Sequence, residues 1–262
     1  MLTTGQKQQF DTFGFVVLRQ LFTPKEVEIL RHASEEILSL GRGGEPFDGH
    51  ARQSVVPFFE RSPELMRLIE DDRIYSIGED LLGPDFFLEG TEGNLHVGDS
   101  QWHTGIDGPD PKKPHNIKIT FYLEPLTAET GALRVIPGSH QPDFRKPMEP
   151  LWAQYNDTTV MPFGVAGQDV PAFVIESKPG DVVVFPEKLW HGSFGGASGR
   201  SQHAISFHTN VVTDKHVAWL LDMYSRTKYS WRPCESMINS DRPRLRRLVA
   251  RLVELGFDST PI

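Results

Sequence analysis

The chain has 262 residues and a formal net charge of −8, from 27 Lys and Arg against 35 Asp and Glu. This acidic balance argues against binding to a nucleic-acid polymer or a membrane surface, because a face that tracks phosphates needs an excess of basic residues. The one cysteine excludes an intrachain disulfide and a cysteine-based zinc site. The first ten residues do not resemble a signal peptide, and no apolar run reaches membrane-spanning length. We therefore expect a soluble, cytoplasmic protein.

Helices are predicted at both ends of the chain. In residues 23–41, Thr, Pro and Glu follow the order of a capping box with Pro at the first helical position, and apolar residues recur at helical spacing. A second helical stretch spans residues 62–83, with a break near Asp71. Residues 218–224 and 243–255 are the best helical segments of the C-terminal part.

Short strands dominate the middle of the chain. From Asp85 on, apolar stretches are separated by Gly, Pro and Asp: FFLEG, NLHVG, NIKITFYLEP, ALRVIP, AFVIES, DVVVFP and HAISFHTNVV. This density of short strands with turn signals favours a β-sandwich or barrel. No segment has the composition of a linker, so we expect a single domain over residues 1–262, with an all-β core and flanking N- and C-terminal helices.

Two of the ten histidines stand out through their surroundings. His103 follows a strand-like segment in SQWHTG, and His191 ends the apolar strand in PGDVVVFPEKLWHGS. Two histidines on neighbouring strands, far apart in the sequence, are what a facial iron site requires, and a carboxylate normally completes the triad. Neutral imidazole suits Fe(II). The sequence therefore predicts His103 and His191 as metal ligands.

The same motifs carry a resemblance to a known family. The chain resembles the phytanoyl-CoA dioxygenase family of Fe(II)/2-oxoglutarate oxygenases from Phe13 to about Asn210. The resemblance rests on WHTG at 102–105, FYLEPLTAETGALRVIPGSH at 121–140 and PGDVVVFPEKLWHGS at 179–193. It implies a double-stranded β-helix (a cupin-like jelly roll), which agrees with the predicted strands. It also implies Fe(II) and 2-oxoglutarate as cofactors and a small-molecule substrate.

The first motif departs from the family at Gly105, where the family's His-x-Asp has its carboxylate. Fe/2-oxoglutarate halogenases resemble this family and carry Gly or Ala there, which lets chloride occupy the vacant coordination position. We favour this interpretation, which predicts chlorination of an unactivated C–H bond of a biosynthetic intermediate. One alternative is a hydroxylase that uses Asp107 or a water as third ligand. Another is a non-catalytic binding protein that keeps the fold.

The cosubstrate motif also departs from the family pattern. The family holds the distal carboxylate of 2-oxoglutarate with an Arg about eleven residues after the second His, and here that position is Gln202. Arg200 lies two residues earlier. Because an Arg makes bidentate contacts to a carboxylate that Gln does not, Arg200 is the candidate for this role. The alternative is a solvated charge in a glycine-rich loop.

Further cavity residues follow from strand alternation. In NIKITFYLEP, Lys118, Thr120 and Tyr122 share one face, which we expect to line the barrel interior near the cosubstrate, while the intervening apolar residues pack against helices. Asn94 and Gln101 are weaker candidates for the 2-oxoglutarate end. Their alternative role is that of polar residues on edge strands.

The substrate is the least determined part of the prediction. Trp102 and Trp190 immediately precede the two histidines and are expected to shape the cavity, although buried tryptophans are also ordinary core. Arg134 is expected to meet an anionic substrate or to brace its turn. Residues 148–168 form a long insertion that we expect to select the substrate. Arg, Lys and Trp near the motifs favour a small anionic aromatic molecule, such as a nucleoside or nucleotide.

Overall fold

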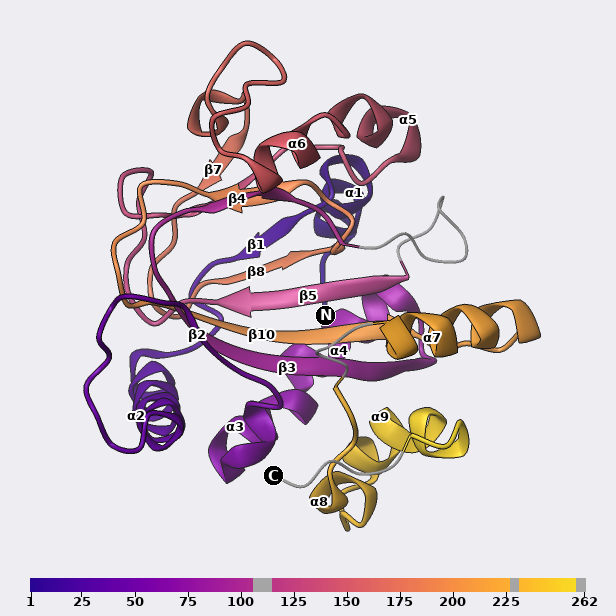
Figure 1. Ribbon diagram of the computed structural model, residues 1–262. Helices are drawn as coiled ribbons and strands as arrows, with labels where there is room; N and C mark the ends of the chain where they lie inside the picture. The colour runs from indigo at the N-terminus through magenta and orange to yellow at the C-terminus, as the bar shows by residue number, and fades with distance from the viewer. Residues whose placement is uncertain (106–114, 227–230, 258–262) are drawn as a thin grey trace.

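Two antiparallel sheets form the core of the computed structural model, which describes residues 1–105, 115–226 and 231–257 (Figure 1). Among these residues, six strands form one sheet, in the order β1 (Val16–Leu18), β8 (Val182–Phe185), β5 (Asn116–Phe121), β10 (Arg200–Thr209), β3 (Phe86–His96) and β2 (Gln53–Val55). Four described strands form the other, in the order β4 (Ser100–His103), β9 (His191–Ser193), β6 (Leu133–Val135) and β7 (Phe173–Ile175). This arrangement confirms the expected double-stranded β-helix.

Helices flank this core on both sides. The described helices are α1 (Thr4–Phe13), α2 (Pro24–Gly41), α3 (Pro63–Glu70), α4 (Asp72–Leu82), α5 (Pro142–Arg145), α6 (Leu151–Asn156), α7 (Asp214–Arg226), α8 (Glu235–Ile238) and α9 (Pro243–Glu254). Short 3-10 turns occupy Phe59–Arg61, Lys146–Met148 and Gly167–Asp169. In Figure 1, α2, α3, α8 and α9 lie on the side of the six-stranded sheet, and α5 and α6 lie on the side of the four-stranded sheet.

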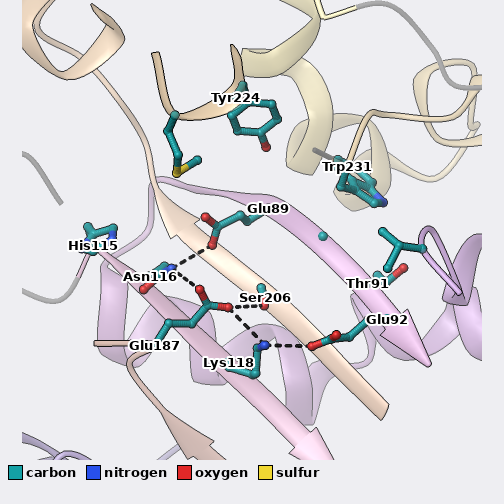
Figure 2. A pocket seen from close by; sticks show the side chains of 13 residues that line it. Glu89, Thr91, Glu92, His115, Asn116, Lys118, Glu187, Ser206, Tyr224 and Trp231 are labelled. Carbon is teal, nitrogen blue, oxygen red and sulfur yellow. Dashed lines mark hydrogen bonds and ion pairs between the residues drawn. The ribbon is translucent and has the colours of Figure 1, made fainter. Parts of the chain in front are cut away.

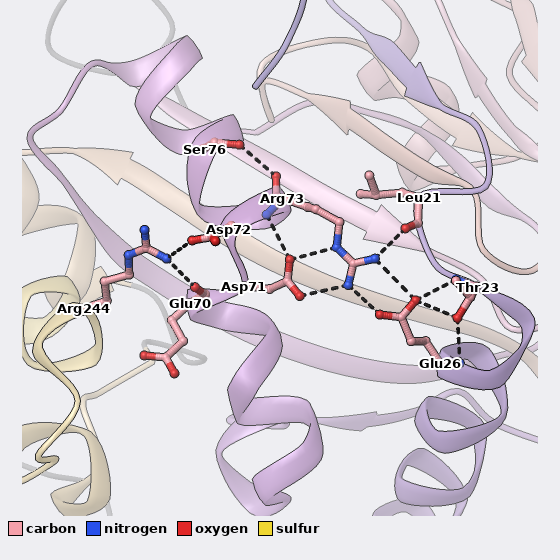
Figure 3. A network of polar contacts seen from close by, with 9 residues as sticks. All are labelled: Leu21, Thr23, Glu26, Glu70, Asp71, Asp72, Arg73, Ser76 and Arg244. Atoms are coloured by element: carbon pink, nitrogen blue, oxygen red, sulfur yellow. Dashed lines mark hydrogen bonds and ion pairs between the residues drawn. The ribbon is translucent and has the colours of Figure 1, made fainter.

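The predicted helix boundaries in the N-terminal part are confirmed by their caps. The side chain of Thr23 accepts a hydrogen bond from the backbone of Glu26, and the Glu26 carboxylate accepts one from the backbone of Thr23. Asp71 ends α3 and caps α4. Arg73 then joins the two caps, because its guanidinium donates to the carboxylates of Asp71 and Glu26 (Figure 3). The hydrogen bond from Arg73 is the main cause that lowers the pKa of Glu26 to about 2.

Strand β5 separates an apolar layer from a polar interior, as its alternation predicted. Ile117, Ile119 and Phe121 belong to the core cluster that also contains residues of α2, α3, α4 and α9. Lys118 and Thr120 point to the opposite face and line a cavity between the two sheets. The polar side chains of β5 are therefore held inside the barrel by the burial of their apolar neighbours against the helices.

Several elements were not predicted from the sequence. Helix α1 begins with a capping box made by Thr3 and Gln6, the same signature that marks α2. Residues 148–168, expected to form an insertion, contain α6 and a 3-10 turn and pack α6 against β4. No helix in the part of the chain that the structure describes combines the length and the apolar character needed to cross a membrane.

His203 is an unusual member of the apolar layer. Its ring stacks on Phe121 with centroids 5.3 Å apart and an interplanar angle of 15°, and its other neighbour, Phe58, lies at 5.4 Å. The side chain is fully buried, and neither ring nitrogen has a hydrogen-bond partner among the described residues. Burial lowers the pKa of His203 to about 3. The native protein therefore holds this imidazole neutral.

We expect His203→Phe to stabilise the protein most at acidic pH. Between pH about 3 and about 6.5, the unfolded chain binds a proton at this position that the native state excludes, so the free energy of unfolding falls as the pH drops through this window. The variant lacks this titrating group, so its free energy of unfolding should fall less steeply with decreasing pH, by roughly 1 kcal/mol per pH unit. Urea denaturation of both proteins at pH 7 and pH 5 measures this difference. The same pH dependence in both proteins would contradict the assignment.

Candidate active site

A cavity of about 320 Å³ lies between the two sheets and brings the predicted metal ligands together with three of the predicted cosubstrate residues. It is lined by Arg52, Glu92, His96, Ser100, His103, Lys118, Thr120, Tyr122, Leu133, Tyr155, Phe185, His191, Gly192, Ser193, Arg200 and Gln202. The predicted histidine pair and the predicted cosubstrate residues Arg200, Lys118 and Thr120 therefore share one space, although they come from four different strands.

The two histidines face each other across paired strands. His103 of β4 is in register with His191 of β9, and their ring centroids are 4.2 Å apart. The Nδ1 atom of His103 lies 2.7 Å from the carbonyl oxygen of Gln101, and that of His191 lies 2.8 Å from the carbonyl oxygen of Leu189. A carbonyl only accepts, so each Nδ1 carries the proton and each Nε2 keeps a lone pair.

Burial supports this tautomer and charge state. It lowers the pKa of His103, and it lowers the pKa of His191 still further, with the charge of His103 as the second cause. Two neutral imidazoles with free Nε2 atoms form a donor set that fits a divalent transition metal. Among the described residues, however, no third His, Cys, Asp or Glu joins them in a metal-binding group.

Gly105 does not border open space. Its backbone nitrogen donates to the carbonyl oxygen of Glu187 at 2.7 Å, and a Cβ built on Gly105 would lie 2.7 Å from the Cβ of Glu187. Gly105 is therefore packed against Glu187. The alternative carboxylate, Asp107, lies outside the described residues.

Arg200 is a buried cation with unused hydrogen-bonding capacity. Only 6% of its surface is exposed, and its Nη2 donates to the hydroxyl of Ser193 at 2.8 Å. Its Nη1 is buried and has no hydrogen-bond partner among the described residues. A Cβ at Gly131 or Gly196 would collide with this nitrogen, so both glycines leave room for the guanidinium. The position fits the binding of a carboxylate from the cavity side.

A chain of hydrogen bonds orders the polar side chains beside Arg200. Gln202 donates to the hydroxyl of Thr120 at 3.0 Å and accepts from Asn94 at 2.6 Å. Asn94, which is fully buried, accepts from Arg52 at 2.8 Å. Asn94 thus supports the cavity through its neighbours, whereas Gln202, at the family's Arg position, lines it directly.

Lys118 forms the charged centre of the interior. Its Nζ lies 2.8 Å from Glu92 and 3.4 Å from Glu187. Burial opposes ionisation of Glu92, but Lys118, together with Asn94 and Arg52, outweighs it and lowers the pKa of Glu92 to about 2. Sequence reasoning missed Glu92, Glu187 and Arg52, because nothing in their local sequence indicates that they meet Lys118 or Asn94.

Both predicted tryptophans lie away from the cavity. Trp102 and Trp190 belong to an apolar cluster with Leu151 of α6, and the indole nitrogen of Trp102 donates to the carbonyl oxygen of Gly167. Successive residues of a strand point to opposite faces, so the residue before an inward histidine points outward. The structure therefore places both tryptophans in an apolar cluster and not in the lining of this cavity, which agrees with the alternative that they are ordinary core. Tyr155 of α6 does line the cavity.

Arg134 and Gln101 also have other positions than expected. Arg134 donates to the carbonyl oxygens of Gln168 and Ala128, which agrees with the bracing role and not with substrate contact. Its neighbour Leu133 takes the inward position on β6. Gln101 contributes its backbone carbonyl to His103, and its side chain does not line the cavity.

We expect Gly105→Ala to destabilise the protein, because its methyl group would overlap Glu187. Overpacking of this kind costs about 1–3 kcal/mol. Gly5→Ala is the matched control, since a Cβ there meets no atom closer than 4.0 Å. Thermal denaturation of the metal-free proteins measures the stability of both variants relative to the wild type. Equal melting temperatures for Gly105→Ala and the wild type would show that the space beside Gly105 is open.

A double-stranded β-helix with two neutral histidines on paired strands is the architecture of iron- and 2-oxoglutarate-dependent oxygenases. The family model for phytanoyl-CoA dioxygenase (PhyH) matches residues 10–204. The chain belongs to this family of Fe/2-oxoglutarate oxygenases.

Relatives within the family are distant. The chain is 25% identical to the ectoine dioxygenase of Sphingopyxis alaskensis over 221 residues, which cover 74% of this chain and 71% of that protein. It is 23% identical to the dioxygenase FUM3 of Gibberella moniliformis over 229 residues, covering 76% and 69% of the two chains.

Solved structures share the fold. The structure of HygX from Streptomyces hygroscopicus with nickel and 2-oxoglutarate bound has a TM-score of 0.62 and 24% identity, and covers 82% of this chain and 90% of that one. The structure of EctD from S. alaskensis with bound Fe has a TM-score of 0.60 and 23% identity, with coverage of 79% and 77%.

Proposed function

We propose that the protein is an Fe(II)/2-oxoglutarate-dependent hydroxylase of a small molecule, with His103 and His191 as iron ligands. The observation that carries this proposal is the pair of neutral imidazoles, each with a free Nε2, in one cavity with the buried Arg200. Family membership supports it, as do the iron, nickel and 2-oxoglutarate bound in similar structures. The non-catalytic alternative would give no reason for a buried, half-satisfied guanidinium beside the histidine pair.

The chain's own residues would bind and orient the cosubstrate. Arg200 lines the cavity and would hold the distal carboxylate of 2-oxoglutarate with its guanidinium, and Thr120 and Gln202 line the same cavity as further polar contacts. Tyr155 and Phe185 add aromatic rings to the lining of the same cavity. When bound, iron and 2-oxoglutarate together supply the activation of dioxygen, with conversion of 2-oxoglutarate to succinate and CO₂.

Hydroxylation is better supported than chlorination. The relatives named above are dioxygenases. One observation still favours chlorination as a second candidate, namely the missing carboxylate at Gly105 in the first motif. In the hydroxylase, Asp107 or a water completes the metal site.

The visible charge-transfer band of the anaerobic complex with Fe(II) and 2-oxoglutarate tests the proposed function without knowledge of the substrate. We expect the wild type to form this band, His103→Ala and His191→Ala to lose it, and chloride to leave it unchanged. If Asp107 is the third ligand, Asp107→Ala weakens the band, whereas Asp110→Ala, three residues further along the sequence, does not. A band that shifts with chloride would favour chlorination, and its absence in the wild type would favour a binding protein.

We expect Arg200→Ala to raise the 2-oxoglutarate concentration that half-saturates this band. Loss of a hydrogen bond to a charged group costs about 1.5–3 kcal/mol, which corresponds to roughly a 10- to 150-fold weaker complex. Arg52→Ala is the control, because Arg52 lines the same cavity but already donates to Asn94. An unchanged half-saturation in Arg200→Ala, or a larger change in Arg52→Ala, would assign the carboxylate to another residue.

A further inference from the structure

A second cavity, of about 350 Å³, lies next to the candidate active site (Figure 2). Lys118 and Glu92 line both cavities, so their ion pair forms part of the wall between them. Glu187, which contacts Gly105 near the histidine pair, lines the second cavity as well. The volume lies within the range of about 300–1,000 Å³ that is typical of small-molecule sites.

A bulge in the six-stranded sheet turns Glu89 into this cavity. Strand β10 pairs Ser206 with Gly90 and Phe207 with Leu88, so Glu89 has no partner in the register. An extra residue of this kind interrupts the alternation of side chains between the two faces of the sheet, and its own side chain then points in a different direction. Glu89 therefore points toward Asn116 and Glu187, as Figure 2 shows.

Hydrogen-bond acceptors outnumber donors at this end of the cavity. The amide nitrogen of Asn116 lies 3.1 Å from a carboxylate oxygen of Glu89 and 3.1 Å from one of Glu187, so one NH₂ group serves both. Asn116 is only 3% exposed, and its Oδ1 is buried without a hydrogen-bond partner among the described residues. Asn116, Ser206 and Lys118 donate to these two carboxylates, whose four oxygens still offer more lone pairs than these donors use.

Acidic groups outnumber basic groups in the lining. Three carboxyl groups, those of Glu89, Glu92 and Glu187, stand against the one ammonium group of Lys118 among the described lining residues. Burial, and then the charge of Glu187, raises the pKa of Glu89 to about 8. A second cation in the cavity would stabilise the ionised form of Glu89 and relieve its repulsion with Glu187.

Aromatic side chains form the opposite wall. Tyr224 of α7 and Trp231 both line the cavity. The indole nitrogen of Trp231 donates to Glu60 at 2.9 Å, and Glu60 also accepts from Thr91, which holds the Trp231 ring in place. Aromatic faces attract organic cations and also pack against an apolar skeleton.

We propose that this cavity is the substrate pocket and that it selects a small molecule with a protonated amine, held by Glu89 and Glu187. The carbon skeleton of the substrate packs against Tyr224 and Trp231. This inference rests on the proposed function, since the reacting C–H bond must face the neighbouring histidine pair. It replaces the anionic substrate favoured by the sequence, because a phosphate would be repelled by the carboxylates.

Matched probes test the charge selectivity. We would compare 2-phenylethylammonium, 2-phenylethanol and 3-phenylpropionate, which share a skeleton and differ in charge, by calorimetric titration of the protein loaded with Fe(II) and 2-oxoglutarate without oxygen. The ammonium probe should bind roughly tenfold or more tightly than the other two. Equal or tighter binding of the alcohol or the carboxylate, or no binding of the ammonium, would overturn the proposal.

Isosteric variants locate the binding site. Glu89→Gln and Glu187→Gln should each reduce the preference for the ammonium probe, whereas Glu124→Gln should keep it, because Glu124 is a partly buried carboxylate that lines neither cavity. Retention of the preference in both cavity variants would overturn the assignment. The charge-transfer band, recorded for the wild type and every variant, separates the two hypotheses. A wild type that forms the band but has no preference for the ammonium probe contradicts the pocket, and a missing wild-type band contradicts the proposed function.

Discussion

The interior of the barrel depends on one ammonium group, that of Lys118, whose side chain keeps only 20% of its surface exposed. Lys118 binds Glu92 at 2.8 Å and Glu187 at 3.4 Å, and so connects β5 to β3 and to the turn before β9. Removing one partner would leave a charge in the interior without its counter-ion, which destabilises the fold. Lys118 and Glu92 line both the histidine cavity and the acidic cavity, so the two cavities adjoin at this ion pair.

Strand pairing determines which side chains meet in each compartment. The register of β4 with β9 brings His103 opposite His191, and the backbone carbonyls two residues earlier fix both tautomers. The same register turns Trp102 and Trp190 outward, where they anchor α6 to the four-stranded sheet. The pairing of β4 with β9 therefore has two consequences: it places the histidines together on one face of the sheet, and it attaches α6 to the other face.

Features of the site that depend on residues of a single strand were predictable from the sequence, and contacts between distant segments were not. The alternation in β5 predicted that Lys118 and Thr120 face the interior, and the motifs around the two histidines predicted their pairing. Arg52 was not predicted, because it meets Asn94 of β3, 42 residues further along the chain, only in the folded protein. Glu89 was missed for a different reason, since a bulge reverses the alternation on which the reading of a strand relies.

The sequence by itself determined the helix caps, the apolar and polar faces of the strands, and the family motifs, because each depends on residues that are neighbours in the chain or share a short period. Tertiary structure alone decided that Glu187 fills the space beside Gly105, that Arg200 is buried against two glycines, and that Trp231 closes an acidic cavity. These contacts join segments separated by tens to more than a hundred residues. Their formation depends on how the sheets and helices pack, which no local pattern encodes.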